Sequence, residues 1–265
     1  MRFATWNVRT MRTGFPNTSE SSNCAQDLRK TAVIDKELHD LNISIAGLQE
    51  TRLPDEGSIR ERHYTFFWKG RNPSQPSCYG VGFAVRNDLL RAAESPEGIS
   101  ERLMSVRLHS KCGPITILSV YAPTLSSQPE TKDNFYSGLS EVLRKIPSTE
   151  RVVILGDFNA RVGSDHTIWS SCLGREGVGR MNENGQRLLE FCMQYQLCIT
   201  NTYFKGKSMH KVSWKHPRSD ENNSLNNRSP LIKTEHLNKI YLSHTFEGQR
   251  VFTITGGLDL ASWWR

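Results

Sequence analysis

The sequence lacks the cysteine patterns that mark a zinc site. Its 6 cysteines form no Cys-x-x-Cys pair, and no group of cysteines and histidines has the spacing of zinc ligands. The even number is compatible with disulfides, but the first residues, MRFATWNVRT, lack the apolar core of a signal peptide. We therefore expect a reduced, intracellular protein.

Long apolar runs are also missing. None approaches the roughly 20 residues that a membrane-spanning helix needs, so we expect no membrane partner. What the sequence does have is 265 residues of ordinary composition, 37% hydrophobic and 23% charged, enough for a sizeable core. Its net charge of +7 favours a polyanionic partner, although many basic proteins bind nothing acidic.

Strand and helix patterns are interspersed along the chain, without an internal repeat. The expected strands are residues 2–7, 43–50, 80–85, the antiparallel runs MSVRLHS and ITILSVYAPT, and RVVILGDFN. The expected helices are residues 26–39, residues 133–145 and the run NENGQRLLEFCMQYQL. This mixture predicts an α/β protein in which sheets pack together with helices outside.

The composition changes after residue 218. The run SDENNSLNNRSPLIKTEH is rich in Asn and Ser and nearly free of apolar residues, which indicates a loop or a disordered segment. We therefore predict one domain over residues 1–218 and a diverged, partly disordered tail over residues 219–265.

Polar side chains stand where the predicted strands end, at Asn7, Glu50, Tyr121, Asp157 and Asn159. Rigid strands fix side chains at their ends, so ligand sites are commonly built there. Plainer interpretations exist, because Asp and Asn are turn residues and a glutamate at a strand end is often merely exposed. Asn7 could likewise cap a turn, and Tyr121 could belong to the core.

The residue types in this set favour phosphoester hydrolysis. Glu50 supplies a hard oxygen ligand, and Mg²⁺ typically takes one or two carboxylates and keeps several waters. Asp157 could act as the base that orients or deprotonates a water. Asn7, Tyr121 and Asn159 can donate hydrogen bonds to phosphate oxygens without adding negative charge.

The motifs TWN, LQET, SVYAP and GDFN, in that order, resemble the endonuclease/exonuclease/phosphatase superfamily. The longer runs GVGFAV, GDFNARVG and NENGQRLLEFC are similar to the apurinic/apyrimidinic-type endonuclease domain of non-LTR retrotransposons. The resemblance covers residues 1 to about 219. It implies a four-layer α/β sandwich like that of DNase I, Mg²⁺ (or Mn²⁺) as cofactor, DNA or another nucleic acid as partner, and a nuclear location. No obligate protein partner is evident.

The resemblance also implies a role for each residue of the set. Glu50 would be the main metal ligand, with Asn7 close to the metal and the scissile phosphate. Tyr121 would contact the phosphate. Asp157 would position the attacking water, and Asn159 would stabilise the developing charge.

A basic stretch, KGKSMHKVSWKHPR, follows the last predicted helix. Its Trp214 matches an aromatic residue near the DNA-facing side of the family's site. Lys211, Lys215 and Arg218 would then bind nucleic acid through phosphates. A solvated edge strand protected by lysines is an equally good interpretation.

Two later elements of the family are absent from the tail. The family has an Asp in a context like LDYV and a terminal Asp-His pair, whereas this chain has LNKIYLS, with Asn238 at the expected position of the acid. We expect the C-terminal strands to be diverged or missing and the nuclease activity to be impaired. A catalytically inactive nucleic-acid- or protein-binding relic and a phosphatase of the same superfamily remain alternatives.

Overall fold

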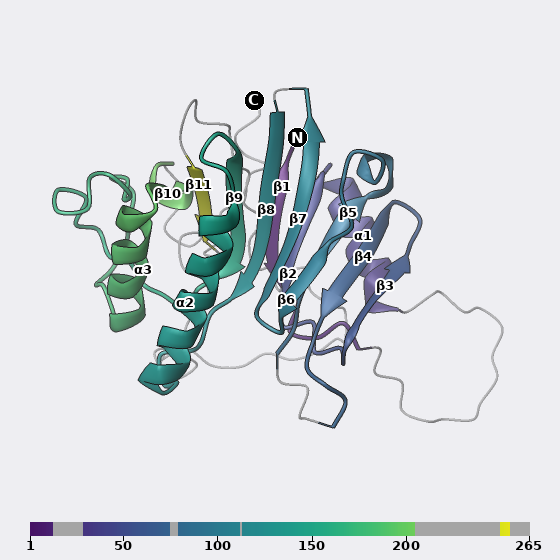
Figure 1. The fold of residues 1–265 in the computed structure, drawn as a ribbon, viewed down its shortest axis with the longest axis horizontal. Helices are drawn as coiled ribbons and strands as arrows, with labels where there is room; N and C mark the ends of the chain where they lie inside the picture. The colour runs from purple at the N-terminus through teal and green to yellow at the C-terminus, as the bar shows by residue number, and fades with distance from the viewer. Residues whose placement is uncertain (13–28, 75–78, 112, 205–249, 255–265) are drawn as a thin grey trace, which may run out of the picture.

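Two β-sheets form the centre of the computed structural model, which describes residues 1–12, 29–74, 79–111, 113–204 and 250–254 (Figure 1). The first sheet has the order β1-β2-β5-β4-β3, with β1 at Phe3–Asn7, β2 at Ile45–Gln49, β3 at Glu56–Arg60, β4 at Tyr64–Lys69 and β5 at Val81–Arg86. The second has the order β10-β11-β9-β8-β7-β6, with β6 at Glu97–Ser100, β7 at Leu103–Ser110, β8 at Gly113–Tyr121, β9 at Arg151–Asp157, β10 at Leu197–Ile199 and β11 at Arg250–Ile254.

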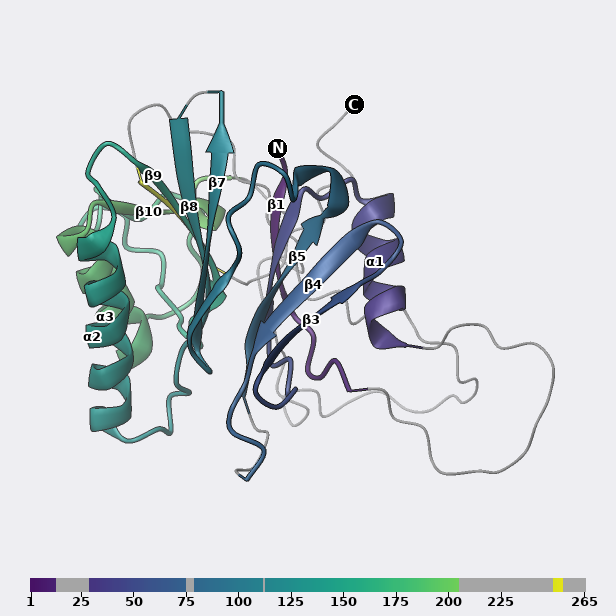
Figure 2. The ribbon, with the colours of Figure 1, turned by 45° about the vertical axis from the view of Figure 1, so that its right-hand side comes forward.

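Helices cover both outer faces of the paired sheets (Figure 2). Helix α1 (Lys30–Asp40) lies on the first sheet, and helices α2 (Pro129–Lys145) and α3 (Glu183–Gln194) lie on the second. Two short 3-10 helices, η1 (Asn87–Leu89) and η2 (Thr200–Thr202), complete the described elements. This is the four-layer α/β sandwich that the sequence predicted.

Three apolar clusters fill the three interfaces between the layers. Neighbouring side chains of one strand enter different clusters, because successive residues of a strand point to opposite faces. In β1, Phe3 packs between the two sheets, whereas Ala4 packs under α1 with Leu38. Strand β2 is buried along its whole length because it has packed layers on both faces.

The two sheets approach each other closely at β2. A Cβ atom added to Gly47 would lie 2.8 Å from the Leu155 Cβ atom of β9, so only glycine fits at this distance. Beside it, the Gln49 amide donates to Ser119 Oγ of β8 over 3.4 Å. These contacts fix the ends of the first sheet's strands against those of the second.

The strands at this contact run in parallel pairs. Strand β1 pairs with β2 so that Asn7 lies opposite Gln49, and β8 pairs with β9 so that Tyr121 lies opposite Asp157. The carboxyl ends of all these strands therefore meet at one edge of the sandwich, which we call the site edge.

Some element boundaries differ from those expected. Helix α1 begins at Lys30, after Arg29 with its non-helical ψ of 132°, and residues 26–28 of the expected helix lie outside the described residues. Helix α2 begins at Pro129 rather than at residue 133, because proline's fixed φ suits the first turn of a helix. The chain leaves β5 through η1. Among the described helices, none combines the length and the apolar character that a bilayer crossing requires.

One described strand comes from the predicted tail. Strand β11 lies between β9 and β10 and runs parallel to both, so a C-terminal strand of the second sheet is present. The remainder of residues 219–265 lies outside the described residues, and the domain boundary at residue 218 stays a prediction.

Candidate active site

The side chains predicted from the sequence come together at the site edge. Asn7 ends β1, Tyr121 ends β8 and Asp157 ends β9, while Glu50 directly follows β2. Asn159 lies two residues beyond β9. Hydrogen bonds connect these five residues, most of them between side chains and one from the backbone of Asn159.

The Asn7 side chain joins the two sheets. Its Nδ2 donates to Glu50 Oε1 over 2.7 Å and to Asp157 Oδ2 over 3.1 Å. Its Oδ1 accepts from the backbone N–H of Arg9 over 3.1 Å. A single amide therefore holds two carboxylates from different sheets close together.

Glu50 accepts two further hydrogen bonds. The Tyr121 hydroxyl donates to its Oε1 over 3.1 Å, and Arg52 Nη2 donates to its Oε2 over 2.7 Å. Burial alone would raise the pKa of Glu50, but the hydrogen bonds from Asn7, Arg52 and Tyr121 hold it below its ordinary value. Burial, followed by the charges of Glu50 and Asp157, raises the pKa of Tyr121. Glu50 is thus an anion at neutral pH, and Tyr121 is a neutral donor.

The loop after β9 fixes the second carboxylate. The backbone N–H of Asn159 donates to Asp157 Oδ1 over 3.0 Å, and Asn159 Nδ2 donates to the carbonyl of Ala122 over 2.9 Å. The first bond orients the carboxylate of Asp157, and the second fixes the side chain of Asn159 beside it.

Left-handed backbone conformations occur at the site edge. Glu50 has a φ of 55°, Arg52 of 54° and Asn159 of 47°. Such values are uncommon for residues other than glycine, and for bulky side chains they cost free energy. They turn the chain sharply after β2 and β9, so that the side chains face the shared edge instead of continuing the strands.

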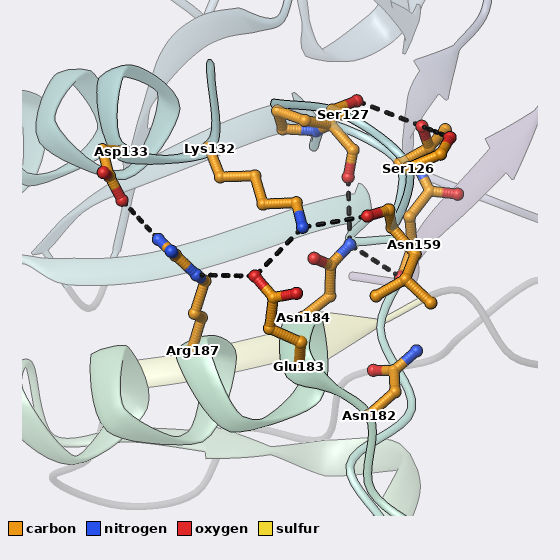
Figure 3. Close-up of polar contacts among 12 residues, drawn as sticks. Ser126, Ser127, Lys132, Asp133, Asn159, Asn182, Glu183, Asn184 and Arg187 are labelled. Atoms are coloured by element: carbon orange, nitrogen blue, oxygen red, sulfur yellow. Dashed lines mark hydrogen bonds and ion pairs between the residues drawn. The ribbon is translucent and has the colours of Figure 1, made fainter. Parts of the chain in front are cut away.

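Helix α3 supports the loops after β8 and β9 (Figure 3). Asn184 is buried in its first turn, and its Nδ2 donates to the carbonyl of Pro123 over 3.1 Å and to that of Asn159 over 3.0 Å. Asn182 caps the same helix by accepting from the backbone N–H of Gly185 over 2.8 Å. One helical turn therefore ties together the loops that follow Tyr121 and Asp157.

A buried lysine reinforces this support (Figure 3). Lys132 of α2 is 3% exposed, and its Nζ donates to the carbonyl of Leu125 over 2.9 Å and to Glu183 Oε1 over 3.1 Å. Its charge is satisfied inside the protein, which indicates a structural role rather than a part in the chemistry.

The residues at the site edge fit a hard divalent cation. Glu50 and Asp157 present carboxylate oxygens that share one amide donor, and Asn7 adds an amide beside them. The described residues contain no group of three His, Cys, Asp or Glu side chains that would enclose a metal. One or two carboxylates with open positions for water match the habit of Mg²⁺ better than that of a closed zinc site.

Sequence reasoning missed several residues around this set. Arg52 stands two positions after Glu50, a spacing that could have drawn attention to it. The contribution of Asn184 has no local signal, because its partners Pro123 and Asn159 come from distant parts of the chain. The predicted nucleic-acid contacts lie outside the described residues; they are Trp214, Lys211, Lys215 and Arg218.

Comparison with known proteins agrees with the motif pattern. Craniofacial development protein 2 from Bos taurus is 31% identical over 213 residues, 80% of this chain and 33% of that protein. The Tragulus javanicus protein is 29% identical over 213 residues, 80% of this chain and 34% of that protein. The chain thus spans about a third of the length of these curated relatives.

Solved structures show weaker likeness. AP endonuclease LMAP from Leishmania major has a TM-score of 0.49 at 15% identity, covering 73% of this chain and 66% of that one. The endonuclease domain of TRAS1, a telomere-specific non-LTR retrotransposon, has a TM-score of 0.46 at 15% identity, covering 73% and 71%. The family match itself covers residues 4–220. The chain belongs to the Endonuclease/Exonuclease/phosphatase family.

Proposed function

We propose that this domain hydrolyses phosphodiester bonds of DNA with Mg²⁺ (or Mn²⁺) as cofactor. The observation that carries the proposal is the Asn7 amide, which holds Glu50 and Asp157 together from two different sheets. A purely structural edge has no need for two carboxylates that share one neutral donor. The net charge of +7 suits a polyanionic substrate, and the motif resemblance supports DNA as the substrate and abasic sites within it.

Each side chain then has a defined task. Glu50 and Asn7 would hold the metal, which supplies polarisation of the phosphoryl group. Asp157, oriented by Asn7 and by the backbone of Asn159, would accept a proton from the attacking water. Tyr121 stays protonated, and its one hydroxyl hydrogen, which Glu50 accepts in the free protein, would turn to the phosphate when substrate is bound. Asn159 uses one amide hydrogen on Ala122 and has a second for a phosphate oxygen.

We further propose that the activity is impaired. The sequence of the tail has Asn238 where the family has an acid, and it has no Asp-His pair after residue 219. Removing one strong stabiliser of a transition state lowers the rate by about 10²–10³. The same observation favours a second candidate, a domain that binds nucleic acid or protein without cleaving.

Nicking of supercoiled DNA and of a duplex with one abasic site tests both candidates. The purified chain is incubated with Mg²⁺, Mn²⁺ or EDTA, beside an Asp157→Ala variant of equal thermal stability. Metal-dependent nicking that the variant loses supports the hydrolase. A folded chain that binds the duplex without nicking it supports the binding domain and contradicts the hydrolase.

A further inference from the structure

Arg102 is fixed next to the candidate active site by its own backbone and side chain. It lies between β6 and β7, and its carbonyl accepts from the backbone N–H of Tyr121 over 2.9 Å. Its Nη1 donates in return to the carbonyl of Tyr121 over 3.0 Å. The guanidinium is thus attached at two points to the residue whose hydroxyl contacts Glu50.

Two aromatic rings hold the guanidinium in place. The Arg102 Cζ atom lies 3.9 Å from the ring centre of Tyr79 and 5.4 Å from that of Tyr121. Arg71 contacts the Tyr79 ring as well, at 4.4 Å. Stacking uses the face of the planar guanidinium and leaves the N–H groups at its edge free to donate.

The charge of Arg102 has no ion-pair partner among the described residues. Neighbouring arginines do have one: Arg52 pairs with Glu50 over 2.7 Å, and Arg71 pairs with Glu101 over 3.3 Å. Arg102 is half-buried, and burial lowers its pKa, although an arginine stays protonated at neutral pH. The fold therefore keeps a partly desolvated cation beside the site without a direct ion pair; the charge of Glu101 acts on it, but that carboxylate pairs with Arg71.

We propose that Arg102, held by Tyr79, binds a backbone phosphate of the DNA next to the phosphate that is cleaved. The inference rests on the proposed function and adds a substrate-binding residue to it. Of the five N–H donors of a guanidinium, one is used on the carbonyl of Tyr121. The others can bind a phosphate through two parallel hydrogen bonds, which a stacked and pre-positioned arginine achieves at low entropic cost.

A plainer role for Arg102 is to buttress Tyr121. That role needs the hydrogen bond and the stacking but not the charge, so the two roles differ in their response to salt. Each phosphate contact made by a cation contributes about 0.9 to the slope of log affinity against log salt concentration for duplex DNA. A buttress contributes nothing to that slope.

The experiment measures binding of a fluorescent duplex in EDTA, where cleavage cannot interfere, between about 50 and 200 mM salt. The full chain is compared with Arg102→Gln, Arg102→Lys and the matched control Arg86→Gln. Arg86 pairs with Asp88 over 2.7 Å and lies at the far end of β5, away from the site edge. Thermal melting of every variant reports whether it is folded.

We expect Arg102→Gln to lower the salt slope by about one and to weaken binding to all duplex sequences alike. Arg102→Lys should keep the slope, because the charge remains, yet bind more weakly because lysine lacks the planar fork. Arg86→Gln should leave the slope unchanged.

Three results would overturn the inference. The first is an unchanged slope in folded Arg102→Gln. If that variant does not fold, a lower slope in folded Arg102→Lys would be the second, because the charge is still present. The third is a wild-type chain that binds no duplex, which would also remove the proposed function. If the wild-type chain binds the duplex and Arg102→Gln has the same salt slope, only the role of Arg102 is contradicted and the proposed function stands.

Discussion

A half-buried and a buried glutamate stand at opposite ends of the same sandwich. Glu50 follows β2 at the site edge, and Glu150 precedes β9 at the other end of the second sheet. Their side chains are 16% and 2% exposed. In both cases burial alone would raise the pKa, and hydrogen bonds hold the pKa below its ordinary value. The direction of the shift therefore does not distinguish them.

Their partners do distinguish them. Arg107 Nε contacts both oxygens of Glu150, over 3.0 and 3.2 Å, and Arg107 Nη2 adds a third bond of 3.1 Å. Thr116 Oγ1 donates a fourth, so the carboxylate is neutralised by a guanidinium fork and satisfied. Glu50 instead receives two neutral donors and a single bond from Arg52, over 2.7 Å, and it shares Asn7 with Asp157. The site edge thus places two carboxylates around one amide, an arrangement that a divalent cation can bind.

The largest effect expected at the site edge comes from Asp157→Asn. The variant keeps the shape of the side chain and removes its charge, so no proton can be accepted from water. We expect kcat for nicking to fall by about 10²–10³ at saturating Mg²⁺. If additional Mg²⁺ instead restored kcat to the wild-type value, Asp157 would act only as a metal ligand.

The nicking activity of Glu50→Gln, unlike that of Asp157→Asn, should recover when the Mg²⁺ concentration is raised. Its main consequence is weaker cation binding, and we expect the Mg²⁺ concentration for half-maximal nicking to rise about 100-fold, at the upper end of effects seen on altering metal sites. The thermal midpoint at pH 7 should fall slightly, because the lowered pKa of Glu50 means that the folded state favours its charged form. Isothermal titration with Mg²⁺ measures the same change without turnover, and unaltered binding would contradict the assignment.

Asn184→Ala asks whether α3 positions the loops of the site. The variant removes two hydrogen bonds to the carbonyls of Pro123 and Asn159, and we expect kcat to fall about tenfold with little change in KM. The control is Asn182→Ala in the same helical turn, which removes the cap and costs about 1 kcal/mol of stability. Equal losses of kcat in both variants would point to the helix as a whole rather than to Asn184.

The smallest effect is expected from Glu150→Gln, and it should concern stability alone. We expect the thermal midpoint at pH 7 to fall by about 2–4 °C while nicking stays unchanged. Because the pKa of Glu150 is lowered in the folded state, its contribution is present above the ordinary value of 4.5 and disappears as the pH falls through the folded value. The difference between variant and wild type should therefore shrink below pH 4.5. A difference that does not shrink at all as the pH falls below 4.5 would show that charge is not its cause.

The strands that carry the candidate site were predictable because they are apolar throughout and stop abruptly at polar residues. Strand β9, for example, is buried from Val152 to Gly156 and ends at Asp157. Strand β3 was not predicted, since Glu56–Arg60 contains Glu, Gly and Ser and is at most half-buried. Strand β11 was not predicted either, because its parallel pairing with β9 depends on distant residues.

The residues of the site likewise divide into those that the sequence predicted and those that it did not. Motif order was enough to select Asn7, Glu50, Tyr121, Asp157 and Asn159, and the structure brings them together. Their chemical roles stay predictions. The positions of Asn184 and Arg102 could not be predicted, because each acts through backbone carbonyls that only the folded chain brings within reach.

The place of β11 affects how the protein forms during translation. Strand β9, which ends at Asp157, pairs on one side with β8, a strand that has already been synthesised. On its other side it pairs with β11, whose residues Arg250–Ile254 leave the ribosome much later. Until then that side of β9 is an unpaired edge, which can bind another chain as readily as its own. The nascent domain therefore needs protection from aggregation at the strand on which its proposed catalytic carboxylate lies.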